Sequence, residues 1–164
     1  MLFRSQEFLD LYKKRKAYDD EFGGGFNLKG EEKTRQEAAK KALDEDIKAQ
    51  LGDARYAELK RGEDYAFQTM FRAADREGLG KETAVKVYDM KKAAEDQARQ
   101  VRSDQTLNSE QRAAALRGIR EETERSVKTA FGEKGYATYE RNSGTFWLNG
   151  ISPDPAAPKP TRKP

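Results

Sequence analysis

The side chains that most often perform acid–base chemistry or bind metal ions are missing from this sequence. Its 164 residues include no histidine and no cysteine, which removes the commonest general base, the commonest metal ligand and every thiolate nucleophile. Acidic residues are abundant, but acids such as Asp44 and Glu121 stand four residues before Lys48 and Arg125. That spacing is typical of surface ion pairs on a helix. We therefore predict a protein that is not an enzyme and holds no metal ion or cofactor.

A glycine-rich segment, GGGF at residues 23–26, invites comparison with phosphate-binding loops. It has neither the GxGxxG nor the GxxxxGK[ST] spacing, and it follows a helical pattern where those loops follow a strand. We expect a flexible turn at this position.

Aromatic and long apolar side chains are the remaining candidates for a functional surface. Phe8 and Tyr12 stand four residues apart, and Phe67, Met70 and Phe71 recur at the spacing of one helix face. Exposed residues of this kind, flanked by charge, would bind a partner protein or an unfolded chain. The same spacing is typical of a helical core, and core packing is the expected fate of most of these residues.

Helices must position these side chains, because the sequence has helical periodicity and no alternating strand pattern. Hydrophobic residues make up 35% of the chain and charged residues 37%, so the apolar stripes are narrow and the helices must pack against one another. We predict an all-α fold of about six helices. The first begins near residue 5, the second and third cover about 30–51 and 53–61, the fourth begins at 64, and the last two cover 81–103 and 109–131.

The sequence repeats itself 80 positions apart. LGDARYAELKR at residues 51–61 aligns with FGEKGYATYER at residues 131–141. In each copy a glycine with positive φ would end a long helix, and a short second helix would carry a tyrosine that packs back. We predict two related hairpin units, residues 28–61 and 107–141. Their matching structural residues are the glycines Gly52 and Gly132, the tyrosines Tyr56 and Tyr136, and the helix-end cations Arg61 and Arg141.

Proline residues and most of the net positive charge are concentrated at the C-terminus. All five prolines lie at residues 153–164, so we predict a single helical domain over 1–150 and a disordered tail over 151–164. The tail has a net charge of +2 out of the +3 of the whole chain. The first 150 residues therefore lack the basic footprint of a nucleic-acid-binding protein.

Residues 73–87 nevertheless approximate a helix-turn-helix, with apolar side chains at core-like positions. In this alternative the protein would be a DNA-binding or regulatory protein, and Lys81, Thr83 and Lys86 would face DNA. Acidic residues on the same helix oppose that role. A further alternative is a structural interaction protein whose partner the sequence does not name.

The N-terminal segment bears on the cellular compartment. MLFRSQEFLDLYKKRK contains no apolar run of the length of a signal-peptide core, and no stretch of about 20 apolar residues is present to cross a bilayer. As written, the chain is expected to stay in the cytoplasm. A signal peptide encoded upstream of Met1 would place it in the periplasm.

The second repeat opens with LNSEQRAAALRGI, in which Asn108 caps the helix and Gln111 reaches back to the backbone of Asn108. LNSEQ resembles the LTxxQ motif of the Spy/CpxP group of bacterial periplasmic helical proteins, over about residues 80–141 and more faintly over 28–61. The segments RKAYDDEFG, LGDARYAELKRGEDYAF and REGLGKETAVKVYDMKKAAE also resemble uncharacterised exported bacterial proteins with the same helical layout. Asn108 stands where the motif has threonine, and Ser109 follows where it has proline.

The resemblance implies a hairpin-rich, often dimeric cradle that holds partly folded clients or senses envelope stress without nucleotide. On this basis we expect a chaperone-like, non-enzymatic binding module that acts as a homodimer on an unfolded or partner protein. The histidines that metal-sensing relatives use are absent, so metal binding is not part of the expectation.

Overall fold

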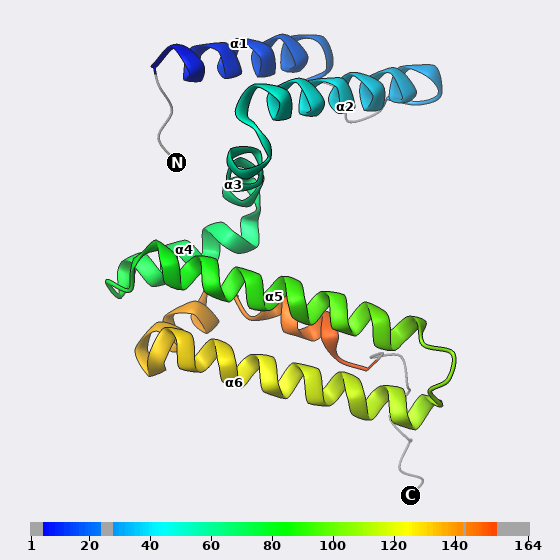
Figure 1. Cartoon of the computed structure of the whole chain (residues 1–164), viewed down its shortest axis with the longest axis vertical. Coiled ribbons are helices and arrows are strands. Elements are labelled where there is room, and N and C mark those ends of the chain that lie inside the picture. Colours follow the sequence, from blue (N-terminus) through cyan, green and yellow to red (C-terminus); the bar gives the residue numbers. More distant parts are fainter. Residues whose placement is uncertain (1–4, 24–27, 143, 154–164) are drawn as a thin grey trace, which may run out of the picture. The chain divides into compact units, whose positions relative to one another are not determined.

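The computed structural model describes residues 5–23, 28–142 and 144–153. Every regular element within these residues is helical, which confirms the predicted all-α fold of about six helices (Figure 1). In chain order the elements are α1 (Ser5–Phe22), α2 (Glu31–Leu51), α3 (Asp53–Glu63), α4 (Tyr65–Arg76), α5 (Gly80–Ser103), α6 (Ser109–Arg141) and the 3-10 helix η1 (Phe146–Ile151).

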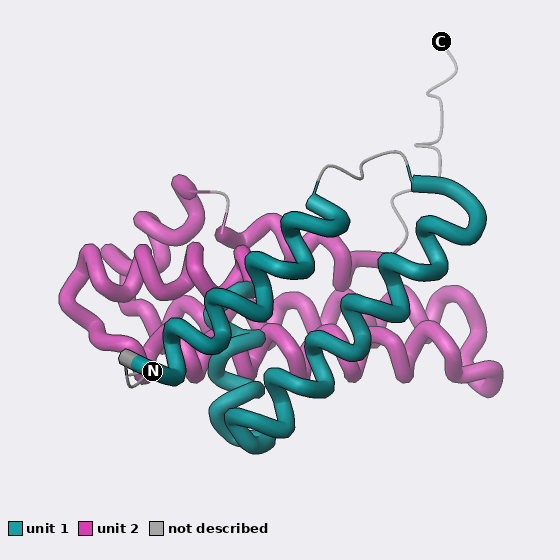
Figure 2. Tube along the Cα trace, turned by 90° about the horizontal axis from the view of Figure 1, so that it is seen from above, with its two compact units in different colours: residues 1–63 teal, residues 64–164 magenta. Residues whose placement is uncertain are grey.

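The helices group into two compact units, residues 1–63 and residues 64–164 (Figure 2). The sequence predicted one helical domain over residues 1–150, so the observed division is finer than the prediction. Its physical basis is that each unit has an apolar cluster of its own. A single residue, Asp64, separates the end of α3 from the start of α4.

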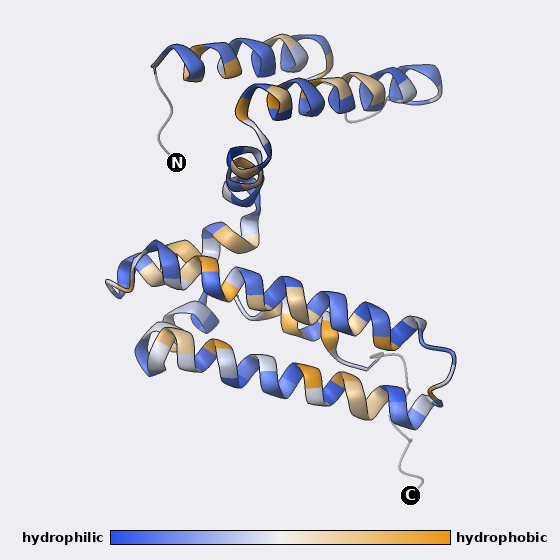
Figure 3. Cartoon of the chain, viewed as in Figure 1, coloured by the Kyte–Doolittle hydropathy of each residue, from blue (hydrophilic) through white to orange (hydrophobic). Residues whose placement is uncertain are grey.

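Unit 1 is a hairpin of α1 and α2, with α3 packed against α2. Its apolar cluster consists of buried Leu11, Ile47 and Leu51, with Leu43, Tyr56 and Leu59 partly buried around them. Most residues of these three helices are hydrophilic (Figure 3). The narrow apolar stripes predicted from composition are therefore found here.

Unit 2 is a longer hairpin of α5 and α6, against which α4 and η1 pack. One apolar cluster joins α4, α5 and the second half of α6, and a smaller one joins α5, α6 and η1. Trp147 of η1 contacts both clusters. The larger cluster contains, among others, Phe67, Met70, Val87, Val127, Phe131 and Tyr139.

The two repeat glycines have nearly the same backbone conformation. Gly52 ends α2 with φ 74° and ψ 164°, and Gly132 interrupts α6 with φ 66° and ψ 172°. This region is open almost exclusively to glycine. A Cβ at either position would meet no atom within 4 Å, so backbone conformation alone requires glycine here. The predicted break after each long helix is confirmed at both sites.

The described chain ends after η1. Ile151, the last residue of η1, is buried, so the fold extends past the predicted domain boundary at residue 150. Residues 154–164 of the predicted tail lie outside the described residues. Between α6 and η1 the backbone passes directly over a ring, because a Cβ at Gly144 would lie 2.1 Å from atoms of the Tyr139 side chain.

Candidate protein-binding surface

Helix α1 buries little apolar surface against its own unit. Leu11, which is 5% exposed, is the only residue of α1 in the buried cluster of unit 1, where it contacts the cluster of Ile47 and Leu51. The other partly buried positions of α1 are the charged residues Glu7, Asp10, Lys14 and Arg15 and, in its second half, the aromatic residues Tyr18 and Phe22. Burial of one leucine supplies only about 2 kcal/mol, so other contacts must help to hold this helix.

Those other contacts are ion pairs from α1 to α2 and α3. The carboxylate of Glu7 accepts two hydrogen bonds from the Arg55 guanidinium, at 2.6 and 2.7 Å. Lys14 lies 2.6 Å from Asp46, and a further pair joins Arg15 to Glu63. The bidentate pair with Arg55 is the geometrically strongest of these. Around Leu11, the first half of α1 is therefore held mainly by ion pairs.

The outward side of the first half of α1 carries three large apolar residues. Phe8, Leu9 and Tyr12 are 55%, 45% and 54% exposed, and the rings of Phe8 and Tyr12 stack with their centroids 6.5 Å apart. We call these three residues the α1 face. Exposed Lys13 and Lys16 border it, and Lys16 pairs with Asp20 at 2.7 Å. Single exposed apolar residues are common, but a cluster on one helix face indicates a binding surface.

The structure separates the five predicted partner-binding residues. Phe8 and Tyr12 lie together on the exposed α1 face, as described above. Phe67 and Met70 are buried in the core of unit 2, because the apolar stripe of α4 faces α5 and α6, so these two candidates are not part of an exposed binding surface. Phe71 is 38% exposed, and its ring stacks on that of Phe67 at 6.4 Å. Leu9 was not among the predicted residues, although its position next to Phe8 places it on the same outward side.

The repeat tyrosines pack back onto their long helices. Tyr136 is buried, and its hydroxyl donates to Glu124 at 3.1 Å. Burial and this hydrogen bond raise the pKa of Tyr136, while the hydrogen bond from Lys128 lowers the pKa of Glu124. Tyr56 is partly buried in the cluster of unit 1. In both units a lysine lies over the ring, with Nζ 4.9 Å from the Tyr136 centroid and 5.4 Å from that of Tyr56.

The remaining repeat residues are at helix ends. The side-chain oxygen of Asn108 accepts a hydrogen bond from the backbone N–H of Gln111 at 2.8 Å, and the side-chain oxygen of Gln111 accepts one from the backbone N–H of Asn108 at 3.0 Å. The predicted capping box is therefore confirmed. Arg61 and Arg141 lie in the last turns of α3 and α6, where a cation interacts favourably with the helix dipole.

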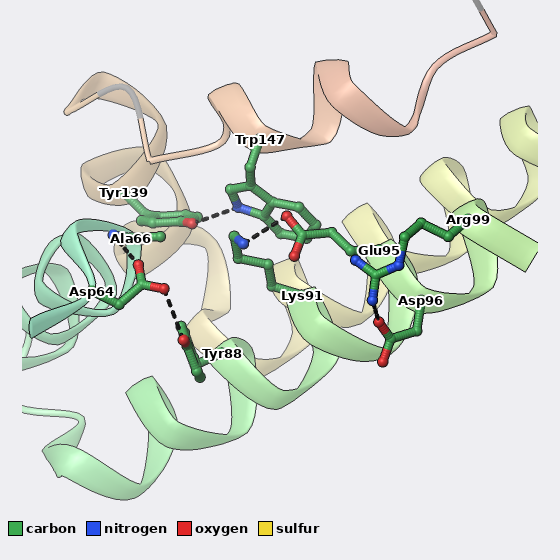
Figure 4. Close-up of polar contacts among 9 residues, drawn as sticks. All are labelled: Asp64, Ala66, Tyr88, Lys91, Glu95, Asp96, Arg99, Tyr139 and Trp147. Atoms are coloured by element: carbon green, nitrogen blue, oxygen red, sulfur yellow. Dashed lines mark hydrogen bonds and ion pairs between the residues drawn. The ribbon is translucent and has the colours of Figure 1, made fainter. Parts of the chain in front are cut away.

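A polar cluster inside unit 2 holds α4 and η1 in place (Figure 4). Asp64 accepts hydrogen bonds from the Ala66 amide and the Tyr88 hydroxyl, both at 2.8 Å. Burial alone would raise the pKa of Asp64, but these two hydrogen bonds lower it below its usual value. The Trp147 indole N–H donates to the buried Tyr139 hydroxyl at 2.8 Å.

The same cluster contains a buried lysine, Lys91, which pairs with Glu95 at 2.6 Å. Its Nζ lies 5.9 Å from the centroid of the Trp147 ring. The groups of this cluster are directed at one another, which suits a structural role. No sequence pattern had indicated that they would meet.

Other kinds of site find little support in the described chain. A groove between α1, α2 and α3 is lined mainly by charged residues, several of which pair with one another, as Lys60 does with Asp44 at 2.7 Å. No group of three metal-ligating side chains occurs among the described residues. None of the helices described here is long and apolar enough to cross a bilayer.

The predicted helix-turn-helix corresponds to α4 and α5, joined by residues 77–79. Ala84 and Val87 are buried as that pattern required. The hydroxyl of Thr83, a predicted DNA-facing residue, donates instead to the Leu79 carbonyl at 2.9 Å. DNA binding by this segment stays a prediction.

No family model, curated protein or solved structure matches this chain.

Proposed function

We propose that this chain is a non-enzymatic binding module, which captures apolar segments of partly folded or partner proteins on the α1 face. The observation that carries the proposal is the orientation of α1: Phe8, Leu9 and Tyr12 point outward, while Leu11 alone is buried. A helix that exposes a cluster of apolar side chains gains from a partner that covers them.

The resemblance to the Spy/CpxP group supports the finer form of the proposal. In that form the protein is an ATP-independent, chaperone-like or envelope-stress protein. It acts as a homodimer, and it works in the periplasm when a signal peptide precedes this sequence. The lysines that border the α1 face supply charge near the apolar residues, which favours rapid and reversible capture.

The test is suppression of aggregation. An unrelated enzyme is unfolded by heat with and without the full chain, in the absence of nucleotide, and light scattering is followed. We expect the wild-type chain to suppress scattering and the double variant Phe8→Ser, Tyr12→Ser to lose most of this effect. Both residues are exposed, so the helical circular dichroism of the variant should match the wild type.

A matched control is Phe146→Ser, which removes an aromatic side chain that is 74% exposed in unit 2. Suppression should persist in this variant. Equal suppression by all three proteins, or equal loss in both variants, contradicts the proposed role of the α1 face. Binding of duplex DNA at low salt, abolished by Lys86→Ala, would favour the helix-turn-helix alternative instead.

A further inference from the structure

Helix α1 and helix α5 are related in sequence. LDLYKKRKAYDD at residues 9–20 aligns without gaps with VKVYDMKKAAED at residues 85–96. Each helix is the first arm of a hairpin whose second arm is a repeat helix, α2 or α6. The similarity between the two units therefore includes the helix before each repeat. The matching positions include Leu9 with Val85, Leu11 with Val87, Tyr12 with Tyr88, Lys16 with Lys92, and Asp20 with Asp96.

The counterparts of the α1 face are covered in unit 2. Phe8, Leu9 and Tyr12 match Ala84, Val85 and Tyr88, which lie in or against the larger apolar cluster. Helix α4 contributes to this cover, because its Phe67 ring meets the Tyr88 ring edge-on at 5.5 Å. Unit 1, as described, contains no helix that corresponds to α4. The α1 face is thus the counterpart of a surface that unit 2 fills with a helix.

We infer that the α1 face binds one short amphipathic helix of a partner protein, with an acidic N-cap and the apolar spacing of α4. The inference rests on the proposed function and specifies its ligand. The spacing is Asp-x-x-Phe-x-x-Met, as in Asp64, Phe67 and Met70. In such a complex the apolar residues of the ligand would cover Phe8, Leu9 and Tyr12, as helix-in-groove ligands do.

Charge complementarity supports an acidic N-cap in the ligand. In unit 2 the Tyr88 hydroxyl donates to the Asp64 carboxylate at 2.8 Å, and Lys92 Nζ lies 5.3 Å from the Tyr88 ring centroid. Tyr12 and Lys16 occupy the matching positions in α1. Lys13 replaces Asp89, so a cation stands beside Tyr12 where an anion stands beside Tyr88. A carboxylate at the N-terminus of the ligand helix would find both a donor and positive charge there.

The experiment uses the full chain and a fluorescent synthetic peptide of residues 64–76, stapled into a helix on its polar side. Fluorescence anisotropy should show saturable binding. The double variant Phe8→Ser, Tyr12→Ser should bind about tenfold more weakly or worse, since central aromatic contacts dominate such interfaces. Phe146→Ser should bind like the wild type. A peptide with Phe67→Ser and Met70→Ser should not bind.

The orientation of the ligand is tested by a double-mutant cycle. Tyr12→Phe in the protein and Asp64→Asn in the peptide each remove one partner of the expected hydrogen bond. Together they should weaken binding by less than the product of their separate effects. Effects that multiply would overturn the proposed docking.

Three results would overturn the helical ligand. In the first, the stapled peptide does not bind, although suppression of aggregation still depends on the α1 face. The proposed function then stands, and only the class of ligand is wrong. The second is equal binding of a scrambled, unstapled peptide, which indicates capture of extended chains. The third is a dimer in sedimentation that the double variant converts to a monomer, because a second copy then covers the face. If neither assay responds to the α1 face, the proposed function fails as well.

Discussion

The pair α2 and α3 and the bent helix α6 are two copies of one backbone design in different surroundings. Both have a long helix, a glycine at positive φ and a short helix whose tyrosine packs back. Ile47 and Val127 are both buried, as are Leu51 and Phe131. What differs is the neighbouring helix, which supplies ion pairs in unit 1 and apolar side chains in unit 2. The comparison teaches that glycine sets the path of the chain, while the neighbours decide what stabilises it.

One matched position illustrates the difference. Arg55 in α3 reaches Glu7 through two hydrogen bonds. Its counterpart in α6 is Gly135, where a Cβ would lie 3.0 Å from a methyl group of Leu79. The same repeat position thus makes an ion pair in unit 1 and a close apolar contact in unit 2.

The largest expected effect comes from replacing one large core residue of each unit with alanine. Phe131→Ala should cost unit 2 about 3–5 kcal/mol, and Leu51→Ala should cost unit 1 about 2–3 kcal/mol. Trp147 is the only tryptophan of the chain and lies in unit 2, so its fluorescence reports on that unit, while far-UV circular dichroism reports on both. Urea titrations of Leu51→Ala should show a shifted dichroism transition and an unchanged fluorescence transition. If both probes shift together in this variant, the units do not unfold independently.

The next test addresses the shared glycines. Gly52→Ala and Gly132→Ala should each cost about 1–3 kcal/mol, because alanine is strained in this backbone region. The two costs should be similar, since the dihedral angles nearly coincide and space for a methyl group is open at both sites. Urea midpoints, read by dichroism for the first variant and fluorescence for the second, measure them. A cost confined to one glycine would show that the two turns are not equivalent.

A smaller effect should come from salt. Raising sodium chloride to about 1 M reduces the Debye length to about 3 Å and weakens exposed ion pairs. The loss per pair is about 1 kcal/mol or less, and it should fall on unit 1, whose α1 is tied by Glu7, Lys14 and Arg15. Glu7→Gln should reduce the salt dependence of the dichroism transition. An equal effect of salt on Trp147 fluorescence would argue against the contrast drawn here.

The smallest effect should come from acid. The pKa of Asp64 and that of Glu124 are both lowered in the folded protein. A lowered pKa stabilises the fold above the unfolded pKa of about 4, and this contribution disappears as the pH falls through the folded pKa. Trp147 fluorescence should therefore show a lower urea midpoint at about pH 3 than at pH 7. Asp64→Asn should flatten that dependence, and an unchanged slope would contradict it.

The sequence predicted the backbone design better than the surfaces. Glycine spacing and the Asn108 capping box are local signals, so the ends of α2 and the start of α6 could be read directly. The orientation of α1 could not, because apolar residues lie on two of its sides and only the neighbouring helices decide which side is covered. For the same reason the sequence could not decide which of the candidates Phe8, Tyr12, Phe67 and Met70 are exposed; the last two are covered by α5 and α6.

Two further features depend on contacts between distant residues. The short segment FWLNGI has no helical period, yet it forms η1. Two tertiary contacts hold it: the Trp147 indole donates a hydrogen bond to the Tyr139 hydroxyl, and the side chains of Leu148 and Ile151 are buried against α5 and α6. The division into two units likewise follows from which helices share a cluster. No local pattern encodes either property.

Because Gly144 lies directly over the Tyr139 ring, the residue types at positions 139 and 144 depend on each other. Any side chain at 144 would have to occupy volume that the phenol already fills, and shrinking the phenol would leave the Trp147 indole without its acceptor. A residue larger than glycine at 144 would therefore require a smaller side chain at 139 and a new acceptor for the Trp147 indole.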